Sequence, residues 1–237
     1  MDSGRRRVVR AAGMPRPAER ITHAEQKSRT RAALVESCRT LITSGADVSM
    51  SVVAQGAQVS EATAYRHFPD LVSLINEALR ELWPAPEVAL EPVRSVTDPV
   101  ERIGFACEFV LRRAHAYQGA VRAAIAATVT RPSTVARRPG FRFGLIDAAL
   151  DPVVTADSER AGRRLAQLKD DLAAILSAEA LFTLTDLRGL GVDDAVASLR
   201  RTAETITSVA MRDIGSRRPR ATRTAAPRRA GGGPERS

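Results

Sequence analysis

The sequence contains few of the residues from which metal sites and most catalytic sites are built. It has three histidines and two cysteines among 237 residues, which is too small a supply of ligands to predict a transition-metal site. It has no glycine-rich phosphate loop, no Gly-x-Ser-x-Gly element and no His-Glu-x-x-His element. The carboxylate pairs at 170–171 and 193–194 fall at predicted helix boundaries, where they are typical of helix caps. We therefore expect no enzyme, no catalytic residues, no metal and no cofactor.

Long apolar runs are also missing. No stretch approaches the roughly 20 apolar residues that a helix needs to span a bilayer. The arginine-rich N-terminus has no apolar segment behind it, as a secretory signal would have. Cys38 and Cys107 lie in apolar helical patterns, which predicts buried free thiols in a reducing compartment. We expect a cytoplasmic protein that does not enter a membrane.

Lysine is scarce, and the positive charge is placed unevenly. Only Lys27 and Lys169 are lysines, yet the net charge is +9, because residues 1–20 carry +4 and residues 216–237 carry +6. Both ends are poor in large apolar side chains and rich in proline, glycine and alanine, which predicts two disordered basic tails. Such tails can add sequence-independent attraction to phosphates. They can equally be solubilising extensions without a fixed role, and the sequence leaves both readings open.

The most informative stretch is 49–68, SMSVVAQGAQVSEATAYRHF. Its pattern predicts two short helices joined by a tight turn at Gln58. The first helix is expected at 51–57, where valine and alanine supply an apolar side. The second begins at Ser60, whose hydroxyl can accept a hydrogen bond from a free backbone N–H of the first turn, and it ends where Pro69 disfavours further helix. Two short helices connected in this way are the parts of a helix-turn-helix.

This stretch resembles the DNA-binding signature of the TetR-type (tetracycline-repressor-like) transcriptional regulators, I-A-x-x-A-G-V-S-x-x-T-[LIV]-Y-x-H-F-x-x-K-x-x-L. Three positions depart from that pattern: Gln58 replaces the turn glycine, Ala64 replaces a larger aliphatic residue, and Leu71 replaces a lysine that commonly contacts a phosphate. The matching residues are Val53, Ala54, Ala57, Val59, Ser60, Thr63, Tyr65, His67, Phe68 and Leu74.

The resemblance implies a set of DNA-binding residues on and beside the second helix. Tyr65 and His67 correspond to phosphate-contacting positions of the family. Arg66 lies on the face that would meet base edges, where arginine can bind guanine with two hydrogen bonds; the alternative is a solvated surface charge. The complete expected set is Ser49, Ser51, Ser60, Glu61, Ala62, Thr63, Tyr65, Arg66 and His67.

The rest of the chain also predicts helices, and no segment shows the alternation of a strand. The helix at 99–117 is apolar over most of its circumference, which indicates a position at the centre of a bundle, with 119–130 as its hairpin partner. The other expected helices span 22–43, 70–82, 141–150, 158–167, 172–188 and 194–212. The expected fold is all-α: a helix-turn-helix DNA-binding domain of three helices at 21–84 and a helical-bundle regulatory and dimerisation domain at 85–215, between tails at 1–20 and 216–237.

Two further sites are expected in the C-terminal domain. Pockets form between the helices of bundles, and the family's regulatory domains use that space for an effector. We expect a small, largely apolar effector in a pocket lined by Phe105, Phe109, Tyr117 and Phe143, although these aromatics can also be ordinary core. We expect a homodimer formed by the last helices through Leu172, Ile175, Leu199 and Ile206, in a four-helix arrangement of the kind that the family uses.

The leading hypothesis is therefore a regulator, more specifically a repressor, that binds a near-palindromic operator in double-stranded DNA and releases it when the effector binds. Two other classes stay open. One is a helical adaptor that binds a protein partner and has lost specific DNA binding, which the departures at Gln58 and Leu71 would favour. The other is an enzyme with an unfamiliar site, which no residue pattern supports.

Overall fold

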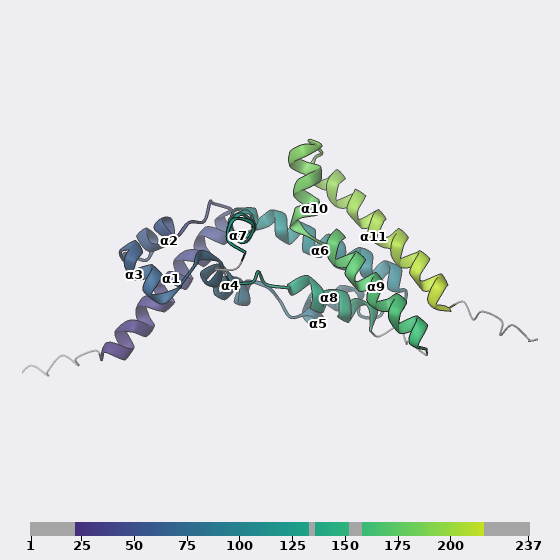
Figure 1. Ribbon diagram of the computed structural model, residues 1–237, viewed down its shortest axis with the longest axis horizontal. Helices are drawn as coiled ribbons and strands as arrows, with labels where there is room; N and C mark the ends of the chain where they lie inside the picture. The colour runs from purple at the N-terminus through teal and green to yellow at the C-terminus, as the bar shows by residue number, and fades with distance from the viewer. Residues whose placement is uncertain (1–21, 133–135, 152–157, 216–237) are drawn as a thin grey trace, which may run out of the picture. The chain divides into compact units, whose positions relative to one another are not determined.

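The structure is a computed structural model that describes residues 22–132, 136–151 and 158–215, and all the regular elements in these ranges are helices (Figure 1). The all-α fold is confirmed for this part of the chain. The chain divides into two compact units, of which unit 1 is Met1–Leu82 with Gln118–Arg138 and unit 2 is Trp83–Tyr117 with Pro139–Ser237. The predicted tails at 1–20 and 216–237 lie outside the described residues. Within the described ranges no helix is long and apolar enough to cross a membrane.

Unit 1 contains five helices in its described residues. They are α1 (His23–Ser44), α2 (Met50–Gly56), α3 (Glu61–His67), α4 (Leu71–Leu82) and α7 (Gln118–Thr130). The predicted capping box begins α1, since Thr22 Oγ1 accepts from the Glu25 N–H at 3.2 Å and the Glu25 carboxylate accepts from the Thr22 N–H at 2.7 Å. Gly45 ends it in the left-handed conformation. The buried core of this unit comes mainly from α1 to α4 and their connections, with Ala120 and Ala124 of α7 added. The buried residues of α1 to α4 and their connections include Leu34, Cys38, Ile42, Val53, Ala54, Ala64, Phe68, Val72, Leu74, Ile75 and Ala78.

The placement of α7 differs from the prediction. This helix was expected to pair with the helix before it, but it packs against α4 and α1 in unit 1. Gly119 allows the start of α7 to lie close to the segment after α1, because a Cβ at this position would lie 2.1 Å from the carbonyl oxygen of Ala46. The Asp70 carboxylate accepts from the N–H of Ser73 at the start of α4 at 2.7 Å. It also accepts from the N–H of Ala136, in the segment after α7, at 3.2 Å. The first unit therefore includes residues beyond the predicted range 21–84.

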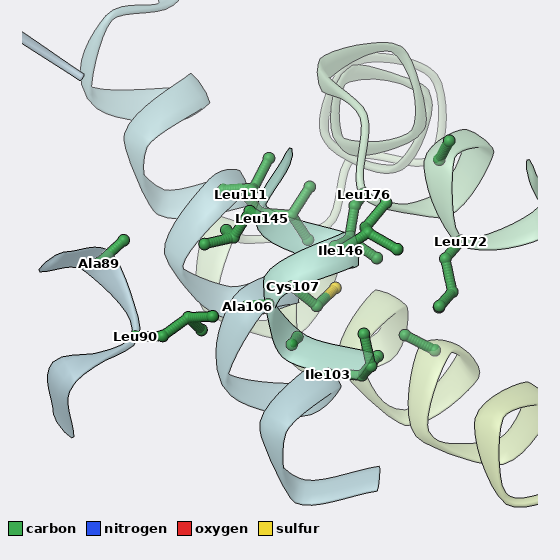
Figure 2. Packing of buried hydrophobic residues seen from close by; sticks show 14 of the residues in the cluster. Ala89, Leu90, Ile103, Ala106, Cys107, Leu111, Leu145, Ile146, Leu172 and Leu176 are labelled. Atoms are coloured by element: carbon green, nitrogen blue, oxygen red, sulfur yellow. The ribbon is translucent and has the colours of Figure 1, made fainter. Parts of the chain in front are cut away.

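Unit 2 is organised around α6 (Pro99–Ala116), which packs against α8 (Phe141–Leu150) and α11 (Val192–Gly215). Its buried face carries Ile103, Ala106, Cys107 and Leu111, which lie at the centre of the cluster in Figure 2. This confirms the central bundle helix expected at 99–117. The remaining elements are α5 (Pro86–Ala89), the 3₁₀ turn η1 (Glu91–Val93), α9 (Glu159–Ile175), α10 (Ala178–Phe182) and the π-helical turn η2 (Thr183–Leu187).

The helices predicted at 158–167 and 172–188 are divided differently. Leu168 and Leu172 are buried on one face, so α9 continues through 168–172 as a single helix. The chain breaks instead at Ser177, which is extended and caps α10 by accepting from the Ala180 N–H at 3.1 Å. The two cysteines, Cys38 in unit 1 and Cys107 in unit 2, are free and buried as predicted, and burial raises the pKa of each thiol to about 12.

A buried arginine joins several helix ends of unit 2. Arg102 on α6 is only 5% exposed. Its guanidinium donates to the carbonyls of Ala148 and Ala149 at 2.8 Å each and to that of Val93 at 2.9 Å, with a longer bond of 3.4 Å to that of Val96. The last carbonyls of a helix have no partner within the helix, and Arg102 donates to two of them at the end of α8. At the end of η1 it is a second donor to the Val93 carbonyl, which also accepts from the Val96 N–H at 3.1 Å.

We predict that Arg102→Met lowers the free energy of unfolding by roughly 3–5 kcal/mol, since it removes one partner of a buried charged network. The matched control is Arg94→Met, because Arg94 is exposed and pairs only loosely with Glu91 at 3.5 Å; its effect should stay within about 0.5 kcal/mol. Chemical denaturation of both variants measures the difference. An equal, small effect in the two variants would show that other donors serve these carbonyls.

Candidate nucleic-acid interface

Helix α3 is a short helix with sharply divided faces. Ala64 faces inward and is fully buried, as is Phe68 directly after the helix. The small side chain at position 64, which departs from the family pattern, lies in this buried contact. The outward face carries Glu61, Ala62 and Arg66, all exposed, and Tyr65, which is 49% exposed. Among the described residues of unit 1 nothing covers this face, and it presents one aromatic ring and charges of both signs.

Serine caps begin both helices of the motif. Ser60 Oγ accepts from the Thr63 N–H at 3.2 Å, as the sequence predicted. Ser49 Oγ accepts from the Val52 N–H at 3.3 Å, so α2 begins one residue earlier than expected. Ser49 Oγ and Ser51 Oγ also share a hydrogen bond of 3.0 Å. The two hydroxyls therefore lie together at the start of α2, with Ser51 exposed.

The turn between α2 and α3 is made without glycine. Gln58 has a φ of +57°, the only positive φ among non-glycine residues in the described ranges. Its N–H donates to the carbonyl of Gln55 and the Val59 N–H donates to that of Ala54, both at 3.0 Å. These two bonds form the Schellman motif, whose left-handed position usually holds glycine. This turn is thus formed by a residue for which the left-handed conformation carries a steric cost.

A chain of hydrogen bonds runs along the surface of α3. The Arg66 guanidinium donates to Thr63 Oγ1 at 2.8 Å, and Thr63 Oγ1 shares a bond of 2.9 Å with Ser60 Oγ. Arg66 therefore lies along the helix in the free protein. Because an arginine has five donors in its fork, this bond leaves others for a partner.

Arg31 on α1 holds the C-terminal end of α3, and the sequence reasoning did not single it out. Its Nη1 donates to the carbonyl oxygen of His67 at 2.8 Å, and its Nη2 bonds to the carboxylate of Glu77 on α4. Its guanidinium lies 4.1 Å from the centre of the Phe68 ring. One signal could have revealed it: Arg31 precedes the buried Leu34 by three residues, so it lies on the apolar face of α1.

His67 is half-buried at the end of α3 and its Nδ1 atom is buried without a hydrogen-bond partner. The pKa of its imidazole lies below the ordinary value of 6.5, first because of burial and then because of the positive charges of Lys27, Arg31 and Arg66. A neutral imidazole surrounded by cations is a site at which an approaching anion would favour protonation.

The four residues expected to line an effector pocket do not share one environment. Phe109 and Tyr117 both lie against the guanidinium of Arg113, at 5.5 and 5.4 Å, and the Trp83 ring lies at 5.7 Å from it. Phe105 is partly buried against the core of unit 2. Phe143 is 50% exposed and lies beneath the guanidinium of Arg142 at 4.7 Å. The effector pocket stays a prediction, with Phe109 and Tyr117 as its best-placed members.

The expected dimer residues are also placed differently from one another. Leu172 is 0% exposed in the core of its own chain, so the prediction that it forms an interface is wrong; α9 is buried by α8 and α11 on this side. Ile175, Leu199 and Ile206 are partly buried against the same core and remain predictions. Among the described residues there is no group of three or more histidine, cysteine, aspartate or glutamate side chains that could hold a metal ion.

We predict that Gln58→Gly stabilises the protein by about 1 kcal/mol, because glycine adopts the left-handed conformation without the steric cost that a side chain incurs. Gln55→Gly is the control, since Gln55 lies within α2, where glycine should destabilise by roughly the same amount. Thermal unfolding of the two variants should shift in opposite directions. A shift downward for both would mean that the Gln58 side chain makes a compensating contact.

Comparisons with known proteins add little to this geometry. No family model matches the chain, and no curated protein matches it. Among solved structures, a crystal structure of RolR in complex with the ligand resorcinol aligns with a TM-score of 0.46 and 20% sequence identity, over 80% of this chain and 97% of that chain. A similarity of this degree does not by itself assign a function to the chain.

Proposed function

We propose that this chain is a TetR-type transcriptional regulator that binds double-stranded DNA through α3. The observation that carries the proposal is the construction of this helix. Ser60 caps its start, Arg31 binds its last carbonyl, and Ala64 is buried beneath it. A seven-residue helix that is fixed on its inner side and exposed on its outer side has the form of a recognition helix that enters the major groove.

The outer face divides into base-reading and phosphate-binding positions. Arg66 has donors left for guanine, and Glu61 at the start of the helix can accept from cytosine. Tyr65 is half-exposed beside them, where its hydroxyl can reach a phosphate. The hydroxyls of Ser49 and Ser51 at the start of α2 offer further phosphate contacts, which fix position and carry no sequence information.

We propose further that the protein acts in the cytoplasm as a homodimeric repressor, released from a near-palindromic operator by a small, largely apolar effector bound in unit 2. Support for the effector is the family resemblance and the aromatic cluster of Trp83, Phe109 and Tyr117 around Arg113. Support for the dimer is that one helix-turn-helix contacts too few bases to find a single site in a genome.

The test is selection of bound duplexes from a random-sequence pool by the wild-type protein. We expect enrichment of an inverted repeat with half-sites about 34–36 Å apart, one turn of DNA, as a dimer requires. Arg66→Ala should then relax the preference at one base step by roughly 1–3 kcal/mol. Arg80→Ala is the control, because Arg80 lies exposed in the last turn of α4, and it should leave the preference unchanged.

Failure of the wild-type protein to enrich any sequence would contradict the proposed function and favour the helical adaptor. Enrichment of a single, unrepeated site would keep DNA binding but contradict the dimer. Enrichment with an unaltered preference in Arg66→Ala would mean that other residues of α3 read the bases.

A second prediction concerns pH. In the free protein, burial and the positive charges of Lys27, Arg31 and Arg66 lower the pKa of His67, and Glu77 offsets part of the Arg31 charge. A phosphate bound beside His67 would raise the pKa of this histidine. DNA binding should then take up a proton, so affinity should rise as pH falls from about 7.5 toward 5.5. His67→Gln should lose this dependence while still binding. A pH profile identical to that of the wild type would remove His67 from the phosphate-binding set.

A further inference from the structure

Three helices of unit 1 meet at the guanidinium of Arg31. This residue lies on α1, donates to the final carbonyl of α3 at His67, and pairs with Glu77 on α4. We propose that Arg31 is a positioning residue, which sets the orientation of α3 toward DNA without touching DNA itself. The inference rests on the proposed function, which supplies the duplex that α3 would read.

The length of α3 is the reason that it needs such a residue. It has seven residues, whereas isolated helices shorter than about 12–15 residues are marginal in water. Its direction is therefore decided by tertiary contacts. Ser60 fixes the N-terminal end and the buried Ala64 fixes one point on the inner face. A third point is needed to define how the helix is aimed, and the bond from Arg31 to the His67 carbonyl supplies it at the C-terminal end.

The contacts of Arg31 engage both terminal nitrogens and one face of its guanidinium inside unit 1. Nη1 binds the His67 carbonyl, Nη2 binds Glu77, and one face lies over the Phe68 ring at 4.1 Å. Its charge is paired with a carboxylate whose side chain is 28% exposed, against 44% for Arg31 itself. Both terminal nitrogens of Arg31 therefore already have a partner inside the unit before any DNA is bound, which assigns the guanidinium to the anchoring of α3.

Lysine could not do the same work. The guanidinium is planar and rigid, so it can donate to two acceptors and stack on a ring at the same time. An ammonium group has three donors, but they spread from a single nitrogen, and the group has no flat face to place over Phe68. The proposal therefore requires the planar geometry of the guanidinium and not only its positive charge. Arg31→Lys, which keeps the charge, tests this requirement.

The matched control lies on the same helix. Arg39 also bridges α1 to α4 through Glu81 and pairs with Glu36 at 3.6 Å, but it makes none of the α3 contacts of Arg31. Arg39→Met removes an α1–α4 ion pair while leaving the contacts of α3 in place. Arg31→Met removes both the α1–α4 pair and the hold on α3, and it keeps an aliphatic chain that can cover Phe68.

The experiment measures affinity for a duplex selected by the wild-type protein and for a random duplex of equal length, over a range of salt. Arg31→Met and Arg31→Lys should lose about 10- to 100-fold in affinity for the selected duplex, and Arg39→Met less than about threefold. Affinity for the random duplex, and the slope of log affinity against log salt, should be unchanged. A direct phosphate contact would instead reduce that slope by about 0.9, and either this reduction or full binding by Arg31→Lys would overturn the proposal.

Amide hydrogen exchange on the free proteins gives a readout that needs no DNA. Arg31→Met should exchange faster at residues 64–68 than the wild type, while α9 and α11 remain unchanged; equal exchange at 64–68 would overturn the proposal. If the wild type selects no duplex but this change is seen, the anchoring of α3 stands and the DNA-binding function fails. Should Arg31→Met not fold, Glu77→Gln, which loosens the same guanidinium, is expected to change both readouts in the same direction by a smaller amount.

Discussion

The end of a short helix must be held by something other than the helix, and this constraint shapes unit 1. With seven residues, α3 leaves a large share of its backbone groups without partners inside the helix. Ser60 Oγ accepts from the Thr63 N–H at its start, and Arg31 donates to the His67 carbonyl at its end. Everything that the outer face of α3 can do toward DNA depends on these two ends, because the side chains that would read a groove move with the helix axis.

The same solution recurs in unit 2 and gives the arginine-rich composition a structural meaning. Arg102 donates to the last carbonyls of α8, and Arg142 donates to the carbonyl of Ala173 near the end of α9 at 2.9 Å. A positive side chain at a helix C-terminus is favoured both by its hydrogen bond and by the helix dipole. Arginine suits this role because one guanidinium can donate to several carbonyl oxygens. The chain has only two lysines that could do so instead.

The sequence was sufficient to predict the helix caps, but it did not predict which helices far apart in the chain pack together. The caps at Thr22 and Ser60 depend on residues three positions apart, so the pattern of neighbours was sufficient to predict them. The start of α7 lies against the segment that follows α1 because Gly119 leaves clearance beside the Ala46 carbonyl, and no local pattern contains this contact. Leu172 was mistaken for an interface residue because a buried apolar side chain and an exposed one look alike until the surrounding helices are placed.

The central claim is that DNA is bound by the exposed face of α3 and the start of α2, and chemical-shift mapping by NMR tests it most directly. A wild-type sample would be titrated with its selected duplex and the backbone amide signals followed. The account predicts the largest changes at Ser49, Ser51, Glu61, Ala62 and Arg66, with the amides of α9 and α11 nearly unaffected by direct contact. Changes concentrated on unit 2, with α3 unperturbed, would contradict it.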